Sequence, residues 1–571
     1  MEESPSLVET PLDRRKLLRL GAAAAAAPAL AGTLVERARA AAPNSQLEDA
    51  TIAQLQADLR SGRTTALQLV QQYTQRIEAL DRSGPSVNSI LELNPDAEAI
   101  ARDRDAERKS GRVRGPLHGI PMVIKGNIDT ADRMTSTAGS LALLGAPAPQ
   151  DATVAKRLRD AGAIILGKAN LSEWANFRSF HSSSGWSGQG GQTRNPYVLD
   201  RNPCGSSSGS GAATSAAFAA AALATETDGS IVCPASICGV VGIKPTVGLT
   251  SRAGVVPISH SQDTVGPHGK TVADAAAVLS ALVGVDPRDP QTSASAGKFS
   301  TDYTKFLDKR GLKDARIGVM RAGVTGYSEE TDRVYEEALA VMRTAGATLV
   351  DPADLDTIDA INSGAAEITV LVFEFKRDLN AYLATRTGLA VHTMADVIAF
   401  NLAHADQELK WFLQEWFDLA EAEIFSQADY DAAAPEARRI GGRDGIDATL
   451  ARFSLDALVA PTGSPSWPTD LVNGDHFLGA SSGPAAVAGY PIVNVPAGEA
   501  FGLPVGLSFI GTAWSEPKLI KLASGFEAAA NARKTPQFRT TLSTDGPRRT
   551  SAVKVKTRRR ALQNAPVVGH L

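Results

Sequence analysis

From Pro203 to Thr246 the chain reads PCGSSSGSGAATSAAFAAAALATETDGSIVCPASICGVVGIKPT, and this stretch decides the fold. It begins with a glycine- and serine-rich run, Gly205 to Gly211, followed by small apolar residues from Ala212 to Leu223. Such small residues predict a tightly packed buried helix over 212–223. A second turn of small residues ends at Ser230. Each turn presents several backbone N–H groups to one point, which suits an anion or a developing oxyanion.

Two serines and an upstream lysine connect this stretch to a known family. Ser206 and Ser230 stand 24 positions apart, and Lys125 ends the segment GIPMVIK. In order and spacing these residues resemble the amidase signature family, and the segment NLSEWANF (170–177) is most similar to its peptide amidases. The resemblance covers most of residues 47–535. It implies an α/β fold, a central mixed and twisted β-sheet covered by helices on both faces.

The resemblance also assigns a role to each matched residue. Ser230 is the expected nucleophile and Lys125 the expected base. Ser206, which is expected to follow a cis peptide bond, relays the proton of Ser230 to Lys125. The expected oxyanion hole consists of backbone N–H groups, those of Thr227, Asp228, Gly229 and Ser230. This chemistry requires no metal and no cofactor.

Lys125 also has an interpretation from its own surroundings. It follows the apolar strand predicted at 122–124, so it is positioned to be buried. Burial disfavours the charged ammonium and lowers its pKa, and a neutral amine is a usable general base near pH 7. The alternative is a surface lysine that closes a strand, and the serine stretch favours the buried interpretation.

Two positions near the expected site depart from the family pattern, and a third has a structural role by resemblance. Gly126 stands where the family commonly has aspartate, and Asp228 stands where glycine is usual, so Asp228 could be a specificity feature. By resemblance, Asp263 is a structural residue near the serine turns.

Composition bounds the class of protein. The 571 residues are 43% hydrophobic, enough for a substantial core, and a net charge of −4 gives no reason to expect nucleic acid as a partner. We interpret the three cysteines, Cys204, Cys233 and Cys238, as small, reduced, buried residues rather than a disulfide framework. The spacing of Cys233 and Cys238 lacks a second ligand pair, which argues against a metal site.

Both ends of the chain differ in composition from the middle. Arg14 and Arg15 precede an Ala/Gly-rich run, which predicts a twin-arginine export signal at 1–42 and a periplasmic or secreted protein. An alanine-rich disordered leader is the alternative, and the run is too short to span a membrane. The amidase domain is expected at 43–540, and a basic, disordered tail at 541–571.

Residues 365–430 form a long amphipathic helical segment rich in aromatic side chains. Aromatic residues at helical spacing are more often core than pocket. In the family, inserted helices in this half of the chain shape the substrate entrance, so substrate choice is expected to depend on this segment.

The sequence therefore predicts an amidase that cleaves the C-terminal carboxamide of peptides to carboxylate and ammonia, as a monomer or homodimer. Alternatives within the family are an amidase of small aliphatic, aryl or amino-acid amides, or a glutaminase subunit, which the export signal disfavours. A remote alternative is an α/β-hydrolase esterase, because Gly205-x-Ser207-x-Gly209 fits the G-x-S-x-G pattern with Ser207 as nucleophile. A catalytically inactive binding protein on the same scaffold is the last alternative.

Overall fold

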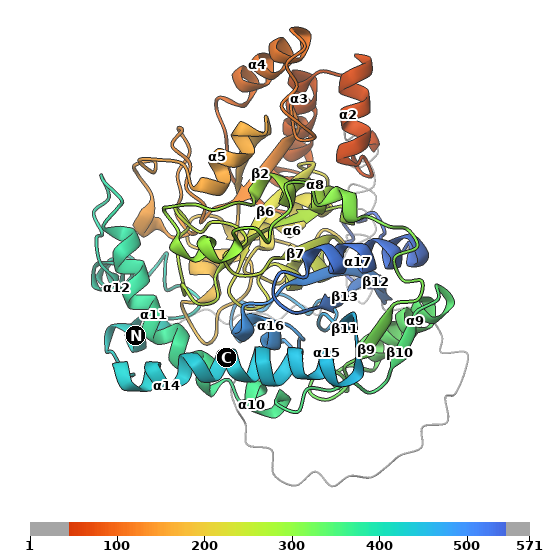
Figure 1. The fold of residues 1–571 in the computed structure, drawn as a ribbon. Coiled ribbons are helices and arrows are strands. Elements are labelled where there is room, and N and C mark those ends of the chain that lie inside the picture. The colour runs from red at the N-terminus through yellow and green to blue at the C-terminus, as the bar shows by residue number, and fades with distance from the viewer. Residues whose placement is uncertain (1–44, 544–571) are drawn as a thin grey trace, which may run out of the picture.

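The structure is a computed structural model that describes residues 45–543 (Figure 1). The leader predicted at 1–42 lies outside the described residues, as does the predicted tail from residue 544 onward. No helix in the described part of the chain is long and apolar enough to cross a membrane.

Eleven of the described strands form one mixed sheet, in the order β1-β3-β2-β6-β8-β7-β12-β13-β11-β9-β10. Parallel pairs lie near both edges, and the middle strands, from β6 to β11, pair antiparallel. The strands are Ile90–Leu93 (β1), Pro121–Lys125 (β2), Ile164–Ala169 (β3), Ala221–Glu226 (β6), Val241–Lys244 (β7), Thr264–Gly269 (β8), Arg316–Val319 (β9), Thr348–Val350 (β10), Ala457–Pro461 (β11), Ile492–Ala500 (β12) and Leu503–Ile510 (β13). A separate small hairpin consists of Trp186–Ser187 (β4) and Gly191–Gln192 (β5).

Helices surround this sheet. The α-helices are Ile52–Ser61 (α2), Ala66–Arg76 (α3), Ala97–Lys109 (α4), Thr153–Asp160 (α5), Ser208–Ser215 (α6), Val232–Ile237 (α7), Val272–Leu282 (α8), Glu329–Thr344 (α9), Ile358–Asn362 (α10), Ala365–Leu383 (α11), Met394–Ala403 (α12), Glu415–Glu421 (α13), Gln427–Arg438 (α14), Ala448–Phe453 (α15), Gly483–Ala488 (α16) and Glu516–Ala530 (α17). Shorter 3-10 or π segments are Ser45–Leu47 (η1), Ile77–Arg82 (η2), Leu141–Leu143 (η3), Glu173–Asn176 (η4), Pro290–Ser295 (η5), Thr304–Phe306 (η6) and Arg439–Asp447 (η7).

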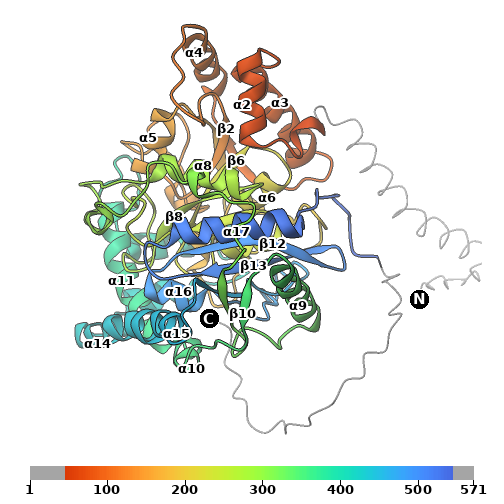
Figure 2. The same cartoon turned by 45° about the vertical axis from the view of Figure 1, so that its right-hand side comes forward.

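The strand period of two residues gives the sheet two apolar faces. In β11, Ala457 and Val459 pack in one cluster with residues of α8, α9 and α17, while Leu458 and Ala460 pack in another with residues of α7, α10, η7 and α16. Figure 2 shows α17 lying over β12 and β13. Because both faces are covered, the structure has the α/β architecture that the resemblance implied.

The stretch 203–246 forms two helices and two strands. The helix predicted at 212–223 is only partly correct, because α6 ends at Ser215 and β6 begins at Ala221. Ala217 has φ of 57° and breaks the helix. A run of buried alanines fits a helix or a strand equally well by pattern alone, and here it supplies the small side chains of a central strand.

The helices α11 to α14 are grouped at one side of the molecule in Figure 1. Helices α11, α12 and α13 share an apolar cluster that includes Phe375 and Phe417, both fully buried. The interpretation as core is confirmed for these two aromatics, whereas Trp411 is exposed. The cluster also contains Trp174 of the NLSEWANF segment, whose ring lies 5.3 Å from that of Phe417. The helical segment is therefore packed directly against that segment.

Candidate active site

Lys125 ends the buried strand β2, between β3 and β6 near the centre of one half of the sheet. Its side chain is fully buried. The Nζ atom donates hydrogen bonds to Oγ of Ser206 and to Oγ1 of Thr225, both at 2.8 Å. The alternative of a surface lysine is therefore wrong, and the sheet brings Lys125 to Ser206 across 81 residues of sequence.

Burial lowers the pKa of Lys125 to about 7, although the negative charges of Asp263 and Glu226 oppose this shift. Removing an ammonium from water is costly, and the two carboxyls compensate for only part of that cost. A substantial fraction of Lys125 is therefore a neutral amine near pH 7, able to accept a proton.

Backbone hydrogen bonds hold the loop that carries Ser206. The Gly205–Ser206 peptide bond is cis, as the resemblance implied, and Ser206 is fully buried. The Ser206 carbonyl accepts a hydrogen bond from the backbone N–H of Ser172 at 3.0 Å. The backbone N–H of Ser207 donates to the carbonyl of Ser230 at 3.2 Å, which joins the two serine turns directly.

The turn that carries Ser230 is held by the carboxylate of Glu226. Its Oε2 atom accepts hydrogen bonds from the backbone N–H groups of Ile231 and Val232, at 2.6 and 2.9 Å. Gly229 has φ of 76°, a left-handed conformation that glycine adopts without a side-chain clash. Ser230 is 7% exposed, so the residue is largely buried but not completely shielded from solvent.

Backbone N–H groups of this turn are available to a ligand. Within residues 45–543, no hydrogen bond occupies the N–H groups of Asp228, Gly229 or Ser230. Oγ1 of Thr227, the first residue of the expected oxyanion hole, donates to Oδ1 of Asp263 at 2.6 Å. Asp263 also accepts from the backbone N–H groups of Ile258 and Ser259. The prediction that Asp263 is a structural residue beside the serine turns agrees with these contacts.

The esterase alternative does not fit the position of Ser207. Its side chain is fully buried, and Oγ donates to the carbonyl of Thr225 at 3.0 Å. No histidine of the described chain forms a hydrogen bond with it. Ser207 therefore braces the loop against β6 instead of presenting an exposed nucleophile.

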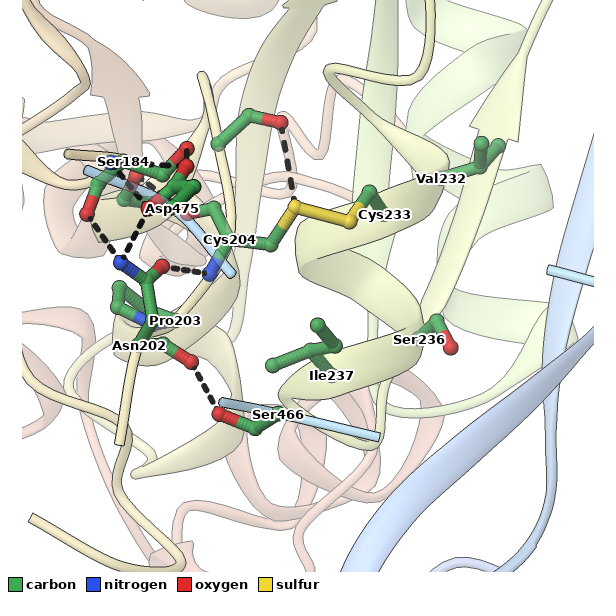
Figure 3. The surroundings of a disulfide bond; sticks show 12 residues. Ser184, Asn202, Pro203, Cys204, Val232, Cys233, Ser236, Ile237, Ser466 and Asp475 are labelled. Atoms are coloured by element: carbon green, nitrogen blue, oxygen red, sulfur yellow. Dashed lines mark hydrogen bonds between the residues drawn. A yellow bond between two sulfur atoms is a disulfide. The ribbon is translucent and has the colours of Figure 1, made fainter. Parts of the chain in front are cut away.

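The interpretation of all three cysteines as reduced residues is wrong. Cys204 and Cys233 form a disulfide with a Cα–Cα distance of 6.1 Å, whereas Cys238 is free and buried (Figure 3). Cys204 lies two residues before Ser206, and Cys233 three residues after Ser230. Their proximity arises because the two serine turns fold against each other, which a sequence separation of 29 does not reveal. The disulfide links the two turns covalently.

Sequence reasoning missed two polar residues, one on β6 and one in the turn that follows β2. Thr225 accepts hydrogen bonds from Lys125 and, at 3.1 Å, from Nδ2 of Asn127. Asn127 is 2% exposed and Thr225 7%. Both stand within two residues of a predicted site residue, so their positions in the sequence were the available signal.

Close packing explains why residue 126 is glycine and not the aspartate that is common in the family. A Cβ atom at this position would lie 2.8 Å from Cδ1 of Leu91 and 3.2 Å from Cδ2 of Leu171. The space that an aspartate would need is filled by these leucines. Lys125 is instead held by Ser206 and Thr225.

One cluster outside the serine turns has the composition of a metal site. Ligand atoms of His260, Glu374 and Asp378 lie within 4.8 Å of one another. The His260 ring contacts both carboxylates, and Glu374 also accepts hydrogen bonds from Ser261 and Tyr430. These contacts account for the cluster as an ionic network that joins the loop before β8 to α11 and α14.

The chain matches known proteins over most of its length. The amidase family model matches residues 68–520. A probable amidase of Arabidopsis thaliana is 42% identical over 500 residues, covering 86% of this chain and 92% of the relative.

Among solved structures, the native peptide amidase of Stenotrophomonas maltophilia is 51% identical, with a TM-score of 0.82. The match covers 87% of this chain and 99% of that chain. An amidase family protein from Bacillus anthracis is 35% identical, with a TM-score of 0.78, covering 86% of this chain and 93% of that chain. The fold, the family match and these relatives lead to one conclusion: the chain belongs to the amidase signature family and is a hydrolase that acts on amide C–N bonds.

Proposed function

We propose that this enzyme hydrolyses the C-terminal carboxamide of peptides to a free carboxylate and ammonia. Ser230 is the nucleophile, Ser206 relays the proton and Lys125 is the general base. The observation on which this proposal rests is the 2.8 Å hydrogen bond between the buried Lys125 amine and the Ser206 hydroxyl. The hydrogen bond between Ser207 and Ser230 supports it, because it holds the second serine turn against the first.

In the first half-reaction, Oγ of Ser230 attacks the amide carbonyl carbon. The Ser230 proton passes to Ser206, whose own proton passes to the neutral amine of Lys125. The oxyanion that forms accepts hydrogen bonds from backbone N–H groups of residues 227–230. Lys125 then returns a proton through Ser206 to the leaving nitrogen, which departs as ammonia.

In the second half-reaction, water attacks the ester that joins the acyl group to Ser230. The relay runs again: Ser206 and Lys125 take the proton from water, then return a proton to Oγ of Ser230. The products are the peptide carboxylate and the free enzyme.

The substrate assignment rests on likeness to the Stenotrophomonas maltophilia enzyme, which is a peptide amidase. The packing of α11 to α13 with the NLSEWANF segment in one apolar cluster supports a role of these helices in substrate choice. Small aliphatic, aryl and amino-acid amides are the competing substrates of the same mechanism.

Ammonia release from a short C-terminally amidated peptide tests the proposal, with wild type beside Ser230→Ala and Lys125→Ala. We expect release by wild type and its loss in both variants, and unchanged release in the surface variant Lys156→Ala. Activity on a benzamide alone would keep the mechanism and move the substrate to small amides. Activity that survives Ser230→Ala would overturn the assignment of the nucleophile.

We also propose that the protein is exported by the twin-arginine route to the periplasm or the medium. The Cys204–Cys233 disulfide supports this location, because disulfides form and persist in oxidising compartments. Cell fractionation tests it: wild type is expected outside the cytoplasm, and a variant with Arg14→Lys and Arg15→Lys inside it. Wild type retained in the cytoplasm would contradict the proposal.

A further inference from the structure

Asp228 is the one exposed residue in an otherwise buried stretch. Of residues 206–250, all are buried except Asp228. It stands two positions before Ser230, between the buried Thr227 and Gly229. Solvent therefore reaches the turn of Ser230 at Asp228.

A second carboxyl group, that of Glu367 in the first turn of α11, is linked to the same turn. The buried Gln262 fixes its place: Nε2 donates to Oε1 of Glu367 at 2.8 Å and to the Thr227 carbonyl at 3.4 Å. The negative charge of Asp228 also raises the pKa of Glu367. The two carboxyls thus form a pair built into the serine turn, contributed by two distant segments.

The pair retains negative charge near neutral pH. Burial and the Asp228 charge raise the pKa of Glu367 to about 8. The pKa of Asp228 is also raised, because its carboxyl group is partly desolvated by the surrounding protein although the residue as a whole is exposed. Two adjacent carboxyls release their protons one after the other, so the pair shares one proton and keeps about one negative charge. Lys244 also acts on Asp228, but its buried Nζ donates to the carbonyls of Tyr490 and Ala485.

The substrate and the product of amide hydrolysis differ in charge and in the hydrogen-bond donors that they offer to such a pair. A primary carboxamide is neutral, and its NH2 group offers two N–H donors. The product carboxylate is negative and offers only acceptors. A carboxylate beside Ser230 therefore accepts a hydrogen bond from the amide nitrogen and repels the product acid.

We propose that Asp228 and Glu367 select a neutral primary carboxamide over a free carboxylate and expel the product acid after deacylation. In this arrangement Asp228 contacts the scissile amide nitrogen, and Glu367 is a positioning residue that maintains the charge of the pair. The inference rests on the proposed hydrolysis of peptide carboxamides. It explains why the usual glycine is replaced by aspartate in a turn that is buried on both sides.

The test compares one peptide as its C-terminal amide and as its free acid. At pH 8, where Lys125 is largely neutral, KM for the amide and the inhibition constant of the acid are measured in wild type, Asp228→Asn, Glu367→Gln and the surface control Asp160→Asn. Asp228 is exposed and Asn has nearly its shape, so the variant keeps the fold and its backbone N–H.

In Asp228→Asn we expect the acid to gain at least about tenfold in binding relative to the amide, since a like charge has been removed. Glu367→Gln shifts the ratio in the same direction but less, because Glu367 is already partly protonated at pH 8. Asp160→Asn leaves the ratio unchanged. If wild type releases ammonia and both pair variants keep the wild-type ratio, this inference fails while the proposed function stands. No ammonia from wild type overturns both.

Discussion

Nζ of Lys125 lies 2.8 Å from Oγ of Ser206, and both side chains are completely shielded from solvent. A buried ammonium at this position would lack water, and its partners here are a hydroxyl group, a threonine hydroxyl and a carbonyl oxygen. The carboxyls of Asp263 and Glu226 act on it through space, without a hydrogen bond to its Nζ atom. This arrangement favours the neutral amine and makes Lys125 a base near neutral pH.

The pH dependence of the reaction follows from that amine. Only neutral Lys125 accepts a proton, and its pKa is about 7. We expect kcat/KM to rise about tenfold per pH unit below pH 7 and to level off above it, because this ratio reports the free enzyme. A profile that is flat between pH 5 and pH 8 would contradict the assignment of Lys125 as base.

The Asp263→Asn variant is expected to shift that profile to lower pH. The Asp263 carboxylate raises the pKa of Lys125, so its removal lowers the inflection point. The variant retains only one acceptor oxygen, so either the Thr227 hydroxyl or the backbone N–H groups of Ile258 and Ser259 lose their acceptor. We expect kcat to fall roughly tenfold as the Thr227 turn loses support. Steady-state kinetics from pH 5 to pH 9 measure both effects. A merely structural residue would lower kcat without moving the inflection.

Asp263 is expected to contribute less to stability as pH rises, whereas the activity is expected to rise with pH. Burial raises its pKa to about 6 from an ordinary value of 3.8. Between these values the folded state binds more protons than the unfolded state, so this carboxyl contributes less stability as pH rises from about 4 to about 6. We therefore expect the unfolding free energy of wild type, relative to that of Asp263→Asn, to fall over this pH range. Urea unfolding at several pH values measures this difference.

Loss of the Cys204–Cys233 disulfide is expected to destabilise the enzyme and to lower its activity. The bond closes a loop with a sequence separation of 29, and loop-closure entropy gives roughly 3–4 kcal/mol of unfolding free energy. We expect the double variant Cys204→Ala/Cys233→Ala to lose about this much in urea unfolding. Cys238→Ala, which removes a free buried thiol, serves as the control.

Thiol titration checks the same bond independently. In denaturant without reductant one thiol is expected to react, that of Cys238, and with reductant all three. Three reactive thiols without reductant would show that Cys204 and Cys233 are not joined.

Restoring the aspartate usual in the family at position 126 is expected to damage this enzyme. Even the Cβ of Gly126→Ala would overlap Cδ1 of Leu91, and overpacking of this kind costs about 1–3 kcal/mol. Gly126→Asp adds a buried carboxylate and costs more. Thermal unfolding measures both variants. Adding Leu91→Ala to Gly126→Ala is expected to recover part of the loss, and strict additivity of the two changes would contradict the proposed overlap.

Much of the candidate site could be predicted from the chain alone. The order of Lys125, Ser206 and Ser230, each following a strand or a turn of small residues, is a local property of the sequence. The burial of Lys125 could be anticipated because an apolar strand precedes it. The resemblance to the family added the fold, since it covers most of the chain.

What the sequence determined by itself is therefore the set of reactive groups and the secondary elements that carry them. Only the tertiary structure decided that Ala221 begins a strand, that Cys204 bonds Cys233 and that Gln262 connects Glu367 to the serine turn. A buried alanine run fits either regular element, and contacts between residues 29 or more positions apart depend on how the sheet and α11 pack. Composition specifies local preference, whereas these pairings arise from long-range packing that no short stretch of the chain encodes.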